Sequence, residues 1–195
     1  MRKLGILVGG ALALAACAPN PPPVPVDPTN PLFAPGYLAQ AASSDQFEIQ
    51  SGQLALQASQ NGVVRNFANM IINDHTRSTQ MVAAAAAAAR VTPLPPAMLP
   101  AQQAMLDQLR SAGTGYNFDT TFQQIQIQAH QSAMALHQNY MTSGDVPQLR
   151  ATAGQIVPVV QMHLSQLQGM RLAPPPPPPP PPAPPPPVRR SGERG

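Results

Sequence analysis

The fold of this chain is decided by residues 61–82, which read NGVVRNFANMIINDHTRSTQMV. One series of positions recurs in this stretch at a spacing of three or four residues: Val64, Phe67, Ile71, His75, Ser78 and Val82. Side chains with that spacing share one face of an α-helix. A run of alanine, the best helix former, follows at residues 83–89. The stretch therefore predicts a helix from about residue 63 to residue 90, with a histidine on its buried face.

Similar patterns predict four more helices along the chain. We expect them at about residues 37–60, 97–111 and 118–142, with a last helix that has Asp145 as its cap and extends to Met170. Pro158 is expected to kink this last helix or to begin it afresh. Glycine- or proline-containing turns separate the helices, at residues 61–62, 91–96, 113–115 and 143–144. This order predicts an all-α fold, an antiparallel four-helix bundle with an extra short helix.

Proline-rich segments on both sides of the bundle define its boundaries. Residues 17–35 form a Pro-rich linker, and residues 173–195 form an arm of almost pure proline that ends in a basic tip. Such segments adopt extended polyproline II, so we expect two disordered tails around a bundle domain at residues 36–172. The arm is either a solvated spacer or a contact for an anionic envelope polymer or a partner protein.

The N-terminus has the features of an export signal. Arg2 and Lys3 precede an apolar stretch, residues 4–13, that is too short to span a bilayer. The following Leu14-Ala15-Ala16-Cys17 resembles the bacterial lipobox. This resemblance implies removal of a lipoprotein signal peptide, residues 1–16, and lipid attachment to Cys17, with two or more acyl chains for stable anchoring. By analogy with enteric bacteria, Ala18 favours the outer membrane, facing the periplasm.

The charge of the bundle excludes some classes of function. Between Phe33 and Leu172 six arginines balance six acidic residues, so the region offers no basic patch for nucleic acid. The sequence also contains no Ser-His-Asp order, Gly-rich phosphate loop or close carboxylate pair. We therefore expect no hydrolase or nucleotide-dependent enzyme, and a non-enzymatic protein is favoured.

One polar residue falls near the middle of each long helix: Glu48, His75, His130 and His163. Bundles build metal sites from side chains on facing helices, and three imidazoles with a carboxylate suit one ion of Zn, Fe, Mn or Cu. No Glu-x-x-His motif occurs, so a di-iron centre is not expected. The alternative is that these residues are hydrogen-bonded core groups that fix helix register, with Glu48 or Asp74 as a partner. His137 is expected to face solvent.

Short motifs that follow one another along the domain point to a resemblance with a known family. They are Phe47-Glu48, Gly52-Gln53-Leu54-Ala55, residues 61–68, Asp74-His75, Phe118-Asp119, Ala129-His130-Gln131, Gly144-Asp145 and Val157-Pro158 with His163-Leu164. In these residues the chain resembles the bacterial family called domain of unknown function 4142. The resemblance implies a ferritin-like fold and an outer-membrane location, but no agreed activity. Two functions stay open, an envelope or stress-related binding module and a metal carrier or oxidase.

Overall fold

The computed structural model describes residues 27–93 and 97–174. Within these ranges the chain forms five helices and no strand. They are α1 (Ala34–Ala58), α2 (Gly62–Ala88), α3 (Pro100–Ser111), α4 (Gly115–Ser143) and α5 (Pro147–Gly169). The predicted all-α fold is confirmed. Cys17 and the arm from residue 175 onward lie outside the described residues.

The helix ends follow from local sequence. The side chain of Asn61 accepts a hydrogen bond from the backbone nitrogen of Val63 at 2.9 Å and so caps α2. Proline occupies the first turn of α1, α3 and α5, where its missing N–H costs nothing. Asp145 does not cap α5. Its carboxylate accepts a hydrogen bond from the Tyr140 hydroxyl at 2.8 Å, and Val146 occupies the cap position. Helix α5 continues through Pro158, so this residue does not begin a new helix.

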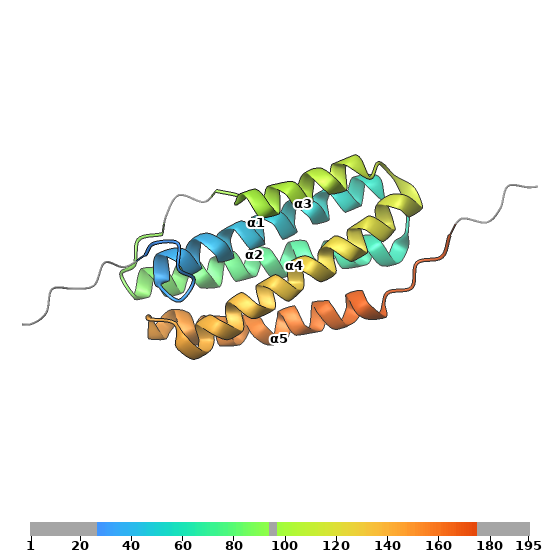
Figure 1. The fold of residues 1–195 in the computed structure, drawn as a ribbon. Helices are drawn as coiled ribbons and strands as arrows, with labels where there is room; N and C mark the ends of the chain where they lie inside the picture. The colour runs from blue at the N-terminus through green and yellow to red at the C-terminus, as the bar shows by residue number, and fades with distance from the viewer. Residues whose placement is uncertain (1–26, 94–96, 175–195) are drawn as a thin grey trace, which may run out of the picture.

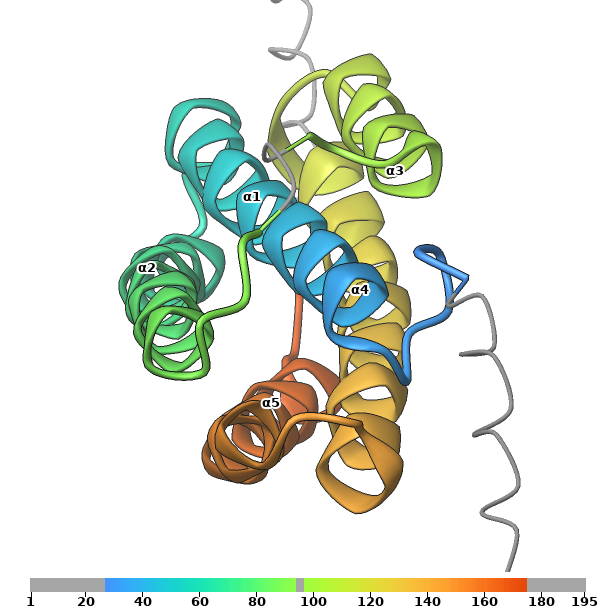
Figure 2. The ribbon, with the colours of Figure 1, turned by 90° about the vertical axis from the view of Figure 1, so that its left-hand side faces the viewer.

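The four long helices form an antiparallel bundle. Helices α1 and α5 run in one direction along it, and α2 and α4 run in the other (Figure 1). In the end-on view the order around the bundle is α1, α2, α5 and α4, so each helix packs against two antiparallel neighbours (Figure 2). The chain crosses from α2 to α4 by one long connection that carries α3. A single crossover of this kind is found in ferritin-like bundles.

Helix α3 makes the outside of the bundle asymmetric. It packs against α1 and α4 and covers the seam between them (Figure 2). The seam between α2 and α5, on the other side of the bundle, has no such cover among the described residues. Access from solvent to the bundle interior therefore differs between these two sides.

The core consists of two apolar clusters. One cluster surrounds Phe67, Phe118 and Phe122, and the other surrounds Tyr37, Tyr140 and Val160. On each of the four long helices, buried polar side chains come between the residues of one cluster and those of the other. Within residues 27–93 and 97–174, every helix is too short or too polar to span a bilayer.

Candidate metal centre

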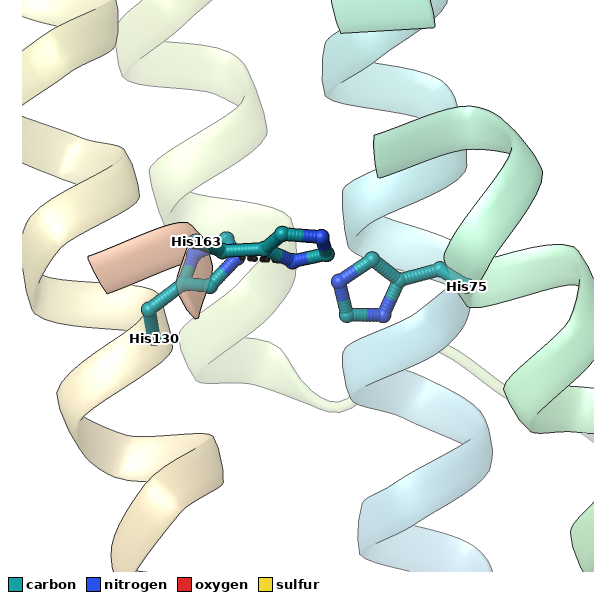
Figure 3. Close-up of side chains that lie close together, drawn as sticks. All are labelled: His75, His130 and His163. Carbon is teal, nitrogen blue, oxygen red and sulfur yellow. Dashed lines mark hydrogen bonds between the residues drawn. The ribbon is translucent and has the colours of Figure 1, made fainter. Parts of the chain in front are cut away.

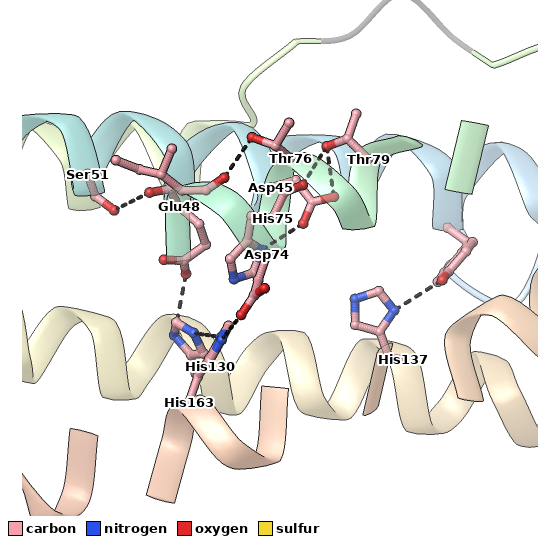
Figure 4. A network of polar contacts seen from close by, with 12 residues as sticks. Asp45, Glu48, Ser51, Asp74, His75, Thr76, Thr79, His130, His137 and His163 are labelled. Atoms are coloured by element: carbon pink, nitrogen blue, oxygen red, sulfur yellow. Dashed lines mark hydrogen bonds and ion pairs between the residues drawn. The ribbon is translucent and has the colours of Figure 1, made fainter. Parts of the chain in front are cut away.

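The four residues predicted for the interior are all buried. Glu48, His130 and His163 have no exposed surface, and His75 is 4% exposed. Glu48 lies on α1, His75 on α2, His130 on α4 and His163 on α5, so each long helix contributes one of them (Figure 4). The bundle therefore brings together residues that are up to 115 positions apart in sequence, from 48 to 163.

Three of these residues form a compact triangle, which we call the histidine cluster (His75, His130 and His163). The centres of the His75 and His130 rings are 5.6 Å apart, as are those of His75 and His163, and those of His130 and His163 are 5.3 Å apart. One ring nitrogen from each histidine lies within 4.8 Å of the other two. Figure 3 shows the His75 ring directed at the other two rings.

The outward nitrogen of each ring has a hydrogen-bond acceptor. Nδ1 of His75 lies 2.8 Å from Asp45, and Nε2 of His163 lies 2.9 Å from Asp74. Nδ1 of His130 lies 2.9 Å from the backbone oxygen of Gln126. Because carboxylate and carbonyl oxygens only accept, each of these outward nitrogens carries the proton and donates.

The inward nitrogens consequently face one another as acceptors. Nε2 of His130 and Nδ1 of His163 are 3.3 Å apart, and neither has a proton to share when the outward nitrogens hold theirs. Among the described residues, Nε2 of His75 has no hydrogen-bond partner. A buried polar atom without a partner costs about 1–3 kcal/mol. Hydrogen bonds within the protein thus satisfy the outward nitrogen of each ring and leave the inward nitrogens without a donor.

Burial keeps two of the rings in the neutral form that binds metals. Burial, and then the charges of His75 and His163, lower the pKa of His130 to about 3. Burial also lowers the pKa of His163, although its hydrogen bond with Asp74 opposes this. For His75, the hydrogen bond with Asp45 and the nearby carboxylates outweigh burial, and its pKa is raised. A proton on His75 would point at two acceptors, so the centre of the cluster attracts a cation.

Glu48 lies next to the histidine cluster but outside its centre. Its Oε1 is 3.5 Å from Nδ1 of His130, the nitrogen that faces away from the other two rings (Figure 4). Neither carboxylate oxygen of Glu48 has a hydrogen-bond partner among the described residues. Burial raises the pKa of Glu48 to about 7, while His75 and Gln126 favour its charged form. The structure therefore places Glu48 as an outer neighbour of His130.

Two aspartates that support the cluster were not singled out as a pair from the sequence. Asp45 is 3% exposed and holds His75 through Oδ1, while its Oδ2 accepts the Thr79 hydroxyl at 3.0 Å. Asp74 holds His163 from the neighbouring helix. Such carboxylate–histidine pairs fix the tautomer and orientation of metal-binding imidazoles. In the sequence, the signal that could have identified Asp45 is its position three residues before Glu48 on the same helix.

His137 was expected to face solvent, and this expectation is wrong. Its side chain is 3% exposed, and the Tyr37 hydroxyl lies 3.0 Å from its Nδ1. Tyr37 is itself buried and stacks on Tyr140 with ring centres 3.8 Å apart. This aromatic packing, which comes from α1 and α4 together, provides a buried partner that the α4 sequence alone does not reveal.

Residues 21–170 match the family described as domain of unknown function DUF4142. The chain belongs to this family. The family resemblance predicted from the motifs is confirmed. No curated protein matches the chain in sequence.

Several solved structures share this fold and are remote from the chain in sequence. CopM in the Cu(II)-bound form is 21% identical with a TM-score of 0.59, and the match covers 70% of this chain and 94% of CopM. CopM in the Ag-bound form is 21% identical with a TM-score of 0.56, covering 70% and 93%. A DUF305 fragment from Deinococcus radiodurans is 17% identical with a TM-score of 0.60, covering 70% and 93%. These matches establish the fold of the DUF4142 domain as a helical bundle.

The dimensions of the histidine cluster fit a single metal ion. Since one ring nitrogen of each histidine lies within 4.8 Å of the other two, some point lies within about 2.8 Å of all three. Zinc–imidazole bonds are about 2.0–2.1 Å long, so side-chain shifts of up to about 0.7 Å would complete the coordination. Three protein ligands also leave one position of a tetrahedral ion for another group.

The buried His137 predicts a pH dependence of stability. Burial lowers its folded-state pKa to about 4, with the charge of His75 adding to this and that of Asp45 opposing it. In the unfolded chain, His137 binds a proton near pH 6.5. The contribution of neutral, buried His137 to the free energy of unfolding is therefore complete above pH 6.5 and is lost as the pH falls towards 4. Relative to His137→Gln, the metal-free protein should lose about 2 kcal/mol of unfolding free energy between pH 7.5 and 4.5.

Urea unfolding of both proteins across this pH range measures the difference. Carboxylates that titrate in both proteins cancel in the comparison. A stability difference that stays constant with pH would show that His137 titrates normally in the folded protein.

Proposed function

We propose that this protein is an exported, lipid-anchored copper-binding protein that holds one ion in the histidine cluster. The observation that carries the proposal is the direction of the three imidazoles. Their outward N–H groups are already bonded to Asp45, Asp74 and a backbone carbonyl, and their inward nitrogens converge in the buried interior of the bundle. A metal ion at that point would satisfy all three inward nitrogens at once.

The donor set favours copper over harder metals. The cluster offers three imidazole nitrogens and no carboxylate oxygen, which disfavours manganese and suits copper, zinc and iron. Among divalent first-row ions a nitrogen site binds copper most tightly. The likeness in fold to CopM, solved in Cu(II)-bound and Ag-bound forms, supports the same choice. Zinc, with the same preferred ligands, is the main competitor.

The surrounding charges suit a bound cation. Asp45 and Asp74 each contact one histidine of the cluster, and Glu48 lies 3.5 Å from a third. Buried charges are tolerated when they are paired, so these carboxylates would balance an ion that the bundle removes from water. Because Glu48 lies on the outward side of His130, we assign it to charge balance and not to direct coordination.

A carrier or sensor of copper is favoured over an oxidase. Oxidases of the ferritin-like class use a pair of metals held by Glu-x-x-His motifs, and this sequence has none. The centre proposed here is mononuclear, with neutral ligands held in place by hydrogen bonds from fixed helices.

Copper binding can be tested with matched histidine variants. His130→Gln should weaken copper binding at least about a hundredfold, because it removes a ligand. His137→Gln, a buried histidine on the same helix and outside the cluster, should bind as the wild type does. Asp45→Asn should weaken binding about ten- to a hundredfold, as other outer partners of metal-bound histidines do.

Copper content per chain after desalting, and competition with a chelator of known affinity, provide the measurements. Circular dichroism establishes that each variant retains its helices. Equal copper affinity in His130→Gln and His137→Gln would exclude the histidine cluster as the site.

The membrane anchor is a separate part of the proposal. The basic start, short apolar stretch and Leu14-Ala15-Ala16-Cys17 support attachment of lipid to the Cys17 sulfur. Two or more acyl chains would hold the protein stably at the membrane.

Replacement of the cysteine tests the anchor. Cys17→Ser should move the protein from the membrane fraction to the soluble fraction, because the lipid has no sulfur to join. Ala18→Ser, one position further on, should stay with the membranes. Fractionation and mass spectrometry of the mature N-terminus make the measurement, and a soluble, unacylated wild-type protein would contradict the anchor.

A further inference from the structure

A groove between α2 and α5 reaches the histidine cluster from solvent. It has a volume of about 260 Å³ and is lined by His75 and His163, by Asp74, Arg77 and Ser78 of α2, by Gln155 of α5 and by apolar residues of both helices. His130 and Glu48, from the opposite helices, are not part of its lining. The groove lies on the side of the bundle that α3 does not cover. An ion bound by the cluster would thus be approached between His75 and His163.

Two buried polar atoms in the groove lining have no hydrogen-bond partner among the described residues. They are Nε2 of His75, which we assign to the metal, and Oγ of Ser78. Ser78 is 7% exposed and lies three residues after His75 on the same helix face. Its hydroxyl is a donor that the protein itself does not use. A ligand in the groove beside the metal would supply the missing acceptor.

From these observations we infer that the metal's remaining coordination position opens to the α2–α5 groove and binds a small anion, with Ser78 donating a hydrogen bond to it. This inference rests on the proposed copper site. Arg77, exposed at the groove, adds a positive charge, while the carboxylate of Asp74 is engaged by His163. Compared with about 30 Å³ for a water molecule in the liquid, the groove admits a small ion and not a folded partner.

Two variants and a control separate the groove from the metal ligands. Ser78→Ala removes the proposed donor and touches no ligand. Val159→Phe fills the groove from α5, where Val159 is half-buried and part of the lining. Val157→Phe is the matched control, because this valine is on the same helix with similar exposure and does not line the groove.

The experiment titrates azide into the full-length, Cu(II)-loaded proteins after their copper content has been measured. In the wild type, azide should produce a charge-transfer absorption band and shift the electron paramagnetic resonance spectrum of the copper. Ser78→Ala should weaken azide about fivefold, the factor expected for one hydrogen bond. Val159→Phe should abolish the response, and Val157→Phe should keep it.

The outcomes distinguish this inference from the proposed function. A wild type that does not load copper would overturn both. A fully copper-loaded wild type whose spectra azide leaves unchanged would overturn the open position alone. Azide binding of equal strength in wild type, Ser78→Ala and Val159→Phe would show that the anion reaches the metal by another side.

Discussion

Three outward hydrogen bonds from buried imidazoles determine what the interior of this bundle can do. Two are accepted by aspartates and one by a backbone carbonyl, at distances of 2.8–2.9 Å. Once these protons are committed, the opposite ring nitrogens are acceptors that face one another in the buried interior of the bundle. Such an arrangement is costly in an ordinary core and becomes favourable when a cation occupies its centre. The same bonds fix the direction of each ring, which is the role of outer partners at metal sites.

The rest of the bundle supports this polar layer. Apolar clusters lie on both sides of it along the helices, and each of the four long helices contributes to it. A buried polar layer of this kind also favours one helix register, because a shift of any helix would leave its partners unsatisfied. The interpretation as register-fixing core groups and the interpretation as a metal site are therefore compatible. The outer hydrogen bonds serve the first role, and the inward nitrogens account for the second.

Helical periodicity in the sequence predicted the fold and the level at which the polar residues meet, but not their roles. The spacing of Val64, Phe67 and Ile71 locates the buried face of α2, and His75 follows in the same series. Periodicity does not specify how a side chain is rotated about its bonds. It therefore could not predict that Glu48 lies next to the outward nitrogen of His130. The partners of the histidines depend on contacts between helices, as with Asp45 and His75. The solvent-facing expectation for His137 failed for the same reason, because its partner Tyr37 lies on another helix.

The tautomers of the histidine cluster are the most direct test of the proposed metal site. They can be read from nitrogen chemical shifts of ¹⁵N-labelled protein by nuclear magnetic resonance, first without metal and then with one equivalent of diamagnetic Ag(I). We predict a proton on Nδ1 of His75 and of His130 and on Nε2 of His163 in both states. Silver should shift Nε2 of His75 and His130 and Nδ1 of His163. Protons on the inward nitrogens of His130 and His163, or silver-induced shifts at the outward nitrogens instead, would contradict it.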